Sequence, residues 1–513
     1  MTRSNRTRTH RPAFSGSDLF MACESRRLLA GDLMHELVYP EGYAHSGISE
    51  FVPITNTGDD SVEYELHARY EVGERDQLLA AGTIPGHTRG GVTINRAGDP
   101  ASMLVRPDTP YALVLRTSRP VAATMSHYDF GTAIGESFTD DRSTDWTFAE
   151  GFKDDSWTRD FVILYNPNNQ DVTVTLTAYT GNGGQISLTR TVGAQRRSGW
   201  NLNNEGAIPA GVFGVRVHAS APIIAALSHY EIVTGRGFGA LGTTGGGATA
   251  GVVTTIEFDD HDEDHHRRGG GGGSGGGNDD GTPDQGPGDF PGGGTSFPAN
   301  SYLTVLNTGA AAATVRFTFI THEDEAPLAN NTRTIVVPAG SRGGLSIRDL
   351  GFGLDDEFGA VYQSDVPVTV TAAVYQGRDA LGAEAATVAA TQWGFGEGYM
   401  SRLRAGFEVT EDIYLFNPTG ENVSVTIQFQ FSNGQVVTVT KSLSRLELED
   451  VKVHATPEIL AMGEDVFYGV RVVATGTIVA TMEHWDRSLG GGFATLGVPA
   501  GTVVPVSSVL SLP

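Results

Sequence analysis

Histidines and carboxylates gather between Asp259 and Arg268, and these side chains can bind transition metals. Imidazole and carboxylate groups suit zinc, nickel or copper. A metal site also needs ligands that surrounding hydrogen bonds hold in a fixed geometry. This stretch instead borders a run of glycines, so we interpret it as solvated charge that binds metal only weakly. The weak ligand candidates are His261, Asp262, Asp264, His265 and His266.

A histidine followed by an aromatic residue recurs near the ends of strand-like segments. Such a histidine could act as a catalytic base if a nucleophile and an orienting acid lay beside it. Ser126 and Ser228 each precede one of these histidines, but neighbours on a strand point to opposite faces and cannot form that pair. The repetition favours packing or hydrogen bonding. The pairs are His127-Tyr128, His229-Tyr230 and His484-Trp485.

A tryptophan and a glutamate recur with one spacing, as Trp146 with Glu150 and as Trp393 with Glu397, in the pattern W-x-F-x-E-G-aromatic. The two glutamates could form a paired functional carboxylate, but their duplication favours a turn or a contact between modules. We expect the two tryptophans to fill the junctions between consecutive modules. The alternative is that they are exposed and stack on sugar rings.

The remaining sequence patterns do not indicate an active site. The sequence contains no HExxH, Walker A or EF-hand pattern, so we predict that the chain is not an enzyme. Its formal net charge of -25 repels nucleic acid and anionic membranes. The same charge attracts cations, so loosely bound calcium remains an alternative. No other cofactor is expected. No apolar run approaches the roughly 20 residues that span a bilayer.

An asparagine at the end of a strand-like segment recurs along the chain and indicates an internal repeat. The intervals between copies are equal within each half and longer between the halves, where a glycine-rich tract lies. Asn-Thr-Gly marks the first and third copies, and Asn-Pro marks the second and fourth. The simplest history is the duplication of one module and then of the pair. The motif residues are Asn56, Asn166 with Pro167, Asn307, and Asn417 with Pro418.

Alternating apolar and polar residues predict antiparallel strands in each module. Residues 171–179 and 185–192 alternate with a period of two around a glycine-containing turn, which predicts a hairpin. Residues 423–431 and 435–443 repeat this design. Pro457 to Met462 is expected to form one short helical turn. About six or seven strands in roughly 100 residues fit an Ig-like sandwich.

The sequence therefore predicts an all-β chain of four tandem antiparallel Ig-like β-sandwich modules, arranged as a duplicated pair with a disordered glycine-rich linker. We expect modules 1 and 2 to form one rod and modules 3 and 4 another, joined by a flexible hinge. The predicted segments are a basic, mostly disordered N-terminal segment at 1–34, module 1 at 35–140, module 2 at 141–258, the Gly/Asp/His-rich linker at 259–296, module 3 at 297–390 and module 4 at 391–513.

Near the N-terminus, residues 23–32 resemble the LEPR-x-LL motif that opens many surface and secreted proteins of planctomycete bacteria, with Cys23 in place of the first leucine. The pattern W-x-F-x-E-G followed by Asn-Pro is similar to tandem Ig-like repeats of bacterial cell-surface proteins. These resemblances imply an extracellular or envelope-associated protein with a non-standard export signal. The residues that match the sorting motif include Glu24, Arg26, Leu28 and Leu29.

These observations favour a noncatalytic extracellular or cell-envelope protein with a structural or adhesive role. Its expected partners are cell-envelope or extracellular matrix components, including polysaccharide, and the oligomeric state is left open. The alternative is a carbohydrate-binding surface protein assisted by calcium, and the third reading is an accessory domain of a hydrolase. Exposed coplanar aromatic rings would favour sugar binding. Burial of the two repeated tryptophans and the His-aromatic pairs would favour structural packing.

Overall fold

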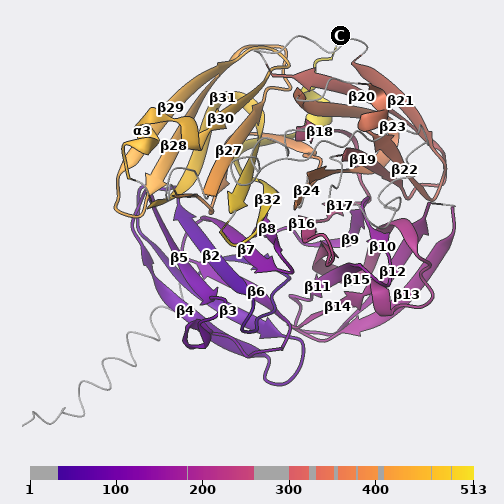
Figure 1. Ribbon diagram of the computed structural model, residues 1–513, viewed down its shortest axis with the longest axis horizontal. Helices are drawn as coiled ribbons and strands as arrows, with labels where there is room; N and C mark the ends of the chain where they lie inside the picture. Colours follow the sequence, from indigo (N-terminus) through magenta and orange to yellow (C-terminus); the bar gives the residue numbers. More distant parts are fainter. Residues whose placement is uncertain are drawn as a thin grey trace, which may run out of the picture.

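The computed structural model describes residues 33–181, 183–258, 300–322, 331–351, 356–376, 379–401, 409–463, 465–486 and 488–512. Within these residues, antiparallel strands form four β-sandwich modules, which follow one another around a common centre (Figure 1). This confirms the predicted all-β fold. No helix in the described residues is both long and apolar enough to cross a membrane. The helical turns are η1 (Pro100–Ser102), η2 (Leu202–Asn204), η3 (Arg348–Leu350), η4 (Val453–Ala455), α3 (Pro457–Leu460) and α4 (Val506–Val509).

Module 1 consists of two antiparallel sheets packed face to face. One sheet has the strand order β1-β6-β3-β4 and the other has the order β5-β2-β7-β8. Apolar side chains of the two sheets, such as Ile54 and Leu115, are fully buried between them. The strands are β1 (His35–Tyr39), β2 (Ser49–Asn56), β3 (Val62–Tyr70), β4 (Asp76–Ile84), β5 (Thr88–Asn95), β6 (Tyr111–Thr117), β7 (Ala122–Asp129) and β8 (Thr132–Ser137).

Modules 2 to 4 repeat this plan with one change, because the equivalents of β6 and β7 are fused into a single long strand. In module 2 this strand is β15 (Gly211–Glu231), whose first half pairs with β12 and whose second half pairs with β11. The long strand therefore belongs to both sheets. The other module 2 strands are β9 (Ser143–Phe148), β10 (Phe152–Lys153), β11 (Thr158–Tyr165), β12 (Val172–Thr180), β13 (Gln185–Val192), β14 (Arg197–Asn201), β16 (Arg236–Leu241) and β17 (Thr243–Thr244).

The second half of the chain contains the two further modules. Module 3 comprises β18 (Ala248–Phe258), β19 (Asn300–Asn307), β20 (Ala313–Thr321), β21 (Thr332–Val337), β22 (Ser341–Ser346), the long β23 (Asp356–Gln376) and β24 (Asp379–Glu384). Module 4 comprises β25 (Val388–Phe395), β26 (Tyr399–Ser401), β27 (Val409–Phe416), β28 (Val423–Phe431), β29 (Val436–Leu443), β30 (Leu448–Lys452), the long β31 (Asp465–Asp486), β32 (Gly491–Leu496) and β33 (Val498–Pro505). The two predicted hairpins correspond to β12–β13 and β28–β29.

The repeated asparagine joins the end of one strand to the hairpin that follows. The Asn166 side-chain amide donates to the carbonyls of Gln170 at 2.8 Å, Val192 at 3.0 Å and Gly193 at 3.1 Å. A buried amide that makes three hydrogen bonds holds the loop in one conformation. Asn56, Asn307 and Asn417 are also fully buried and make the equivalent three bonds.

Strand β18 corrects the predicted boundary of module 2 at residue 258. It pairs antiparallel with β23 of module 3, and Val253 and Ile256 are buried in the core of that module. Residues 259–299 therefore connect two strands of module 3 instead of separating two halves of the molecule. The prediction failed because an alternating pattern identifies a strand but does not identify the sheet that it joins.

The predicted arrangement as two separate rods is also wrong, because module 4 packs directly against module 1. Thr55 donates to the carbonyl of Gly396 at 3.3 Å, and Ser137 donates to the carbonyl of Leu496 at 2.9 Å. Figure 1 shows the yellow end of the coloured chain beside its indigo beginning. The modules thus form a closed ring.

The inner strands β8, β16, β24 and β32 surround the centre of the ring (Figure 1). Small residues allow these strands to pack closely. A Cβ atom at Gly135 would lie only 2.3 Å from the ring of Phe493, and one at Gly382 would lie 2.0 Å from Phe238. An aromatic side chain of one module therefore occupies the space above a glycine of the next.

Candidate functional site

A carboxylate contact recurs where one module meets the next. A glutamate follows the first strand of modules 1, 2 and 4 and reaches into the neighbouring module. The repeated E-G motif therefore makes contacts between modules, which is one of the interpretations that the sequence allowed. The pairs are Glu41 with Ser228, Glu150 with Arg342 at 2.5 Å, and Glu397 with Ser126 at 2.6 Å.

Sequence reasoning missed the arginines that accompany these glutamates. Arg89, Arg197 and Arg342 lie opposite the residue that precedes the repeated asparagine, so the three positions are equivalent. Arg89 lies 3.6 Å from Glu397 across the interface between modules 4 and 1. An alignment of the modules on their asparagines would have revealed these arginines.

The interface between modules 3 and 4 uses the same positions with exchanged chemistry. Leu448 occupies the position of the arginine. Thr255 occupies that of the glutamate, and Glu483 occupies that of Ser126 and Ser228. The Thr255 hydroxyl donates to the Glu483 carboxylate, so the acid lies on the opposite module. One hydroxyl–carboxylate hydrogen bond is kept while the arginine is replaced by an apolar side chain.

Each of the recurring histidines is buried beside a carboxylate of its own module. Burial lowers the pKa of His229, but the charge and hydrogen bond of Asp160 outweigh burial and raise it to about 9. The Glu50 and Glu411 carboxylates likewise outweigh burial and raise the pKa of His127 and His484. The Nδ1–oxygen distances are 2.8 Å for His127 with Glu50, 2.7 Å for His229 with Asp160 and 2.8 Å for His484 with Glu411.

The choice of Glu or Asp as the partner of the histidine varies with the aromatic residue that lies next to this acid. Glu411 accepts a hydrogen bond of 2.5 Å from Tyr468, and Glu50 accepts one from Tyr111 in the same way. Module 2 has the shorter Asp160 in place of the glutamate, and Phe213 in place of the tyrosine. The acids and histidines are therefore engaged in buried hydrogen bonds within the modules, as the structural interpretation of these histidines expects.

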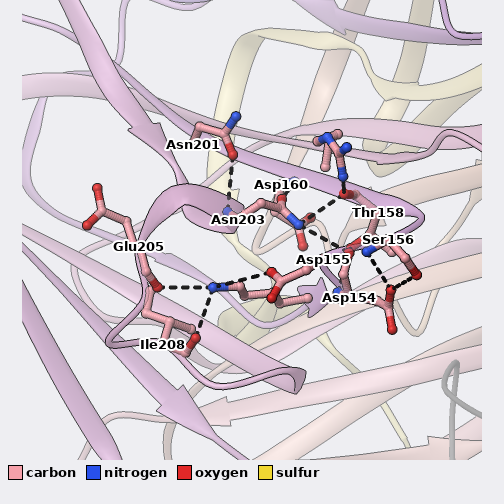
Figure 2. Close-up of polar contacts among 11 residues, drawn as sticks. Asp154, Asp155, Ser156, Thr158, Asp160, Asn201, Asn203, Glu205 and Ile208 are labelled. Carbon is pink, nitrogen blue, oxygen red and sulfur yellow. Dashed lines mark hydrogen bonds and ion pairs between the residues drawn. The ribbon is translucent and has the colours of Figure 1, made fainter.

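A loop network surrounds Asp160 (Figure 2), the carboxylate that is hydrogen-bonded to His229. The Asn203 side chain donates to the carbonyls of Asp154 at 3.2 Å and Thr158 at 3.0 Å, and it accepts a hydrogen bond of 3.0 Å from the Asp160 amide. The buried Lys153 ammonium donates to two further carbonyls of the loop after η2. A cation held by carbonyls stabilises this corner of module 2.

The repeated tryptophans lie inside their modules and not at the junctions where we expected them. Trp146 and Trp393 are each 1 % exposed. The indole of Trp146 donates to the Ile223 carbonyl at 3.0 Å, and that of Trp393 donates to the Ile478 carbonyl at 2.9 Å. Tyr230 is also buried. Because both tryptophans are buried, neither can stack on a sugar ring.

A cleft with a volume of about 560 Å³ lies between modules 4 and 1. Tyr399 and Phe467 stack in parallel on its wall, with ring centroids 4.3 Å apart and an interplanar angle of 12°. The Arg89 guanidinium lies 4.9 Å from the centroid of Phe467. Glu397 and His484 also line this cleft, so the interface hydrogen bonds border an open space.

Three buried groups beside this cleft have ligand atoms within 4.8 Å of one another, namely Glu397, Glu411 and His484. They do not fit a metal ion, because their ligand atoms already serve the protein. Glu397 accepts from Ser126, Glu411 accepts from Tyr468, and the two His484 nitrogens bond to Glu411 and to Tyr128 at 2.9 Å. A nearby guanidinium, that of Arg89, also opposes a second cation.

Two further carboxyl groups lie beside a cavity of about 370 Å³ that residues of all the modules line. Burial raises the pKa of Glu136 to about 8, even though Thr495 and backbone amides donate to it. Burial and the charge of Glu136 raise the pKa of Glu384 to about 8 as well. These side chains are therefore largely protonated at neutral pH.

Other sequence candidates lie outside the described residues. These are the sorting-motif residues Glu24, Arg26, Leu28 and Leu29, and the weak metal-ligand candidates His261, Asp262, Asp264, His265 and His266.

No family model and no curated protein matches this chain. Among solved structures, the Thermotoga maritima protein 1070 is 10 % identical and aligns over 20 % of this chain and 94 % of its own, with a TM-score of 0.18. A tetra-tandem repeat from the extending region of a large adhesion protein is 11 % identical and aligns over 88 % of this chain and 93 % of its own, with a TM-score of 0.11.

Proposed function

We propose that this chain is a noncatalytic extracellular or cell-envelope protein with a structural and adhesive role. The observation that carries the proposal is the closed ring, in which the residues that could do chemistry form buried hydrogen bonds between and within the modules. Glu41, Glu150 and Glu397 bond across interfaces, and the histidines bond to carboxylates inside the modules.

A ring of this kind suits a binding or display role for a physical reason. Closure fixes each module against two neighbours. The surface loops and clefts therefore lose little conformational entropy when a partner binds. The net charge of -25 favours solubility and disfavours nucleic acid as a partner. Envelope or extracellular matrix components remain the proposed partners.

Protease shaving of intact cells, with mass spectrometry of the released peptides, tests the location. Release of peptides from the first and the last module without lysis supports the proposal. Peptides that appear only after lysis would remove the surface role. A cytoplasmic marker protein that stays protected in the same sample is the control for leakage.

Carbohydrate binding is the second candidate, and a specific observation favours it. The buried tryptophans exclude the expected stacking platform, but Phe467 is 42 % exposed at the cleft between modules 4 and 1. This cleft thus offers an accessible aromatic side chain among polar groups, as small-molecule sites do.

A further inference from the structure

Two of the module interfaces carry clefts with matched side chains. The cleft between modules 4 and 1 has a volume of about 560 Å³, and that between modules 1 and 2 has a volume of about 540 Å³. Such volumes are within the range of small-molecule sites. The matched residues, in that order, are Arg89 with Arg197, Glu397 with Glu41, His484 with His127, and Tyr399 with Tyr43.

The interface between modules 2 and 3 differs from these two at one position of the inner strand. Arg236 begins the inner strand β16, and its side chain is fully buried, 5.7 Å from the centroid of Tyr375. The equivalent residues in modules 1 and 4 are Thr132 and Gly491. Thr132 is fully buried and donates to the Gly237 carbonyl, and Gly491 lies against the backbone of Thr132 and Ala133.

The two clefts differ in how closely a carboxylate of the protein pairs with their arginine. Arg197 forms a 2.5 Å ion pair with Glu71. Within the described residues, Arg89 donates no side-chain hydrogen bond, and its carboxylate neighbour Glu397 lies 3.6 Å away. A guanidinium has five N–H donors, and a largely buried one without acceptors is costly. The Arg89 side chain at the cleft between modules 4 and 1 is therefore not hydrogen-bonded to an acceptor, and the oxygen atoms of a ligand could supply one.

The wall of this cleft adds an apolar surface beside the unused donors. Tyr399 and Phe467 are stacked there, and the carboxylates of Glu397 and Asp486 also line the cleft. A pyranose matches this combination, because its CH groups pack on aromatic rings while its hydroxyls both accept and donate. The acidic lining and the chain's net charge of -25 disfavour an anionic sugar.

We propose that the cleft between modules 4 and 1 binds a neutral pyranose saccharide, with the Tyr399–Phe467 stack against the sugar and Arg89 donating to its oxygens. This deepens the proposed function and rests on it, since it names the class of envelope component that the ring would hold. The site combines residues of the first and last modules, so only the closed ring contains it.

Calorimetric titration of the full chain with defined trisaccharides tests the proposal. The probes are cellotriose, maltotriose, mannotriose and tri-N-acetylchitotriose, with trigalacturonate as the anionic comparator. We expect at least one neutral probe to bind with a Kd at or below about 1 mM and the anionic probe to bind more weakly. Failure of all four neutral probes, or preference for the anionic one, would overturn it.

Variants at exposed aromatic residues locate the site. Phe467→Ala should weaken binding about tenfold, and Phe467→Trp should retain it. The matched control is Phe130→Ala, because Phe130 is 47 % exposed at the cleft between modules 1 and 2. Binding lost in the control and kept in Phe467→Ala would contradict the assignment. Cell shaving does not depend on sugar binding, so the two proposals can fail separately.

Discussion

Glu397 of module 4 accepts a 2.6 Å hydrogen bond from Ser126 of module 1, although the two residues are 271 positions apart. The equivalent bond joins Glu41 to Ser228 between modules 1 and 2. The contact that closes the ring is therefore the same as one that joins neighbours in sequence. Closure thus uses a contact that also joins two modules consecutive in the chain.

Loss of the closing carboxylate should destabilise the ring. Glu397→Ala leaves Arg89 largely buried without its carboxylate neighbour and the Ser126 hydroxyl without an acceptor. We expect the free energy of unfolding to fall by ~2–4 kcal/mol. Chemical denaturation measures it, with the exposed Glu458→Ala as the control that should change stability by less than ~0.5 kcal/mol. Equal values for the two variants would contradict a role in closure.

The exchanged chemistry between modules 3 and 4 predicts a compensating pair. Thr255→Glu should place a second carboxylate against Glu483 where Leu448 supplies no positive charge, at a cost of ~2–4 kcal/mol. Adding Glu483→Ser recreates the arrangement of Glu41 with Ser228 and should recover most of that stability. A double-mutant cycle by denaturation measures the coupling. Additive losses would show that the two positions do not act as one contact.

The elements of each module could be predicted from the sequence because local patterns determine them. Residues 423–431 are the predicted strand and form β28, and the helical turn expected from Pro457 is α3. The four asparagines indicated the internal repeat, and in the structure each asparagine side chain donates the same three hydrogen bonds. These features depend on contacts within a few tens of residues.

The partners of these elements could not be predicted, because they depend on contacts far apart in the chain. Nothing in residues 248–258 distinguishes a strand of module 2 from one of module 3. The tryptophans lie in their own cores, and periodicity does not separate a core face from a junction face. The arginines that face the glutamates become visible only when the modules are aligned.

Cleavage at Arg267-Arg268 should leave one particle instead of two independent halves. The amino-terminal fragment then carries β18, which pairs with β23 in the other fragment. Modules 4 and 1 also stay in contact. We expect trypsin-nicked protein to elute from size exclusion at the position of the intact 54.3 kDa chain, and to separate only in denaturant. Native separation into two folded halves would restore the two-rod arrangement.

The protein should lose stability as the pH rises from neutral to about 9. The pKa of Glu136 is raised from 4.5 to about 8, so the stability that its protonated form contributes is complete below pH 4.5 and is lost as the pH rises through 8. The pKa of His229 is raised from 6.5 to about 9, so its contribution is complete below pH 6.5 and is lost through pH 9. The loss of a proton from either Glu136 or His229 therefore lowers the stability as the pH rises.

Glu136→Gln isolates the first of these contributions, because the amide stays neutral at every pH. We expect the variant to be more stable than the parent by ~4 kcal/mol at pH 9 and similar to it at pH 5. Urea denaturation across this range measures the difference, and Glu458→Gln on the surface is the control. If the difference between parent and Glu136→Gln stays constant with pH, the carboxyl ionises without cost and is not shielded from water as the ring geometry requires.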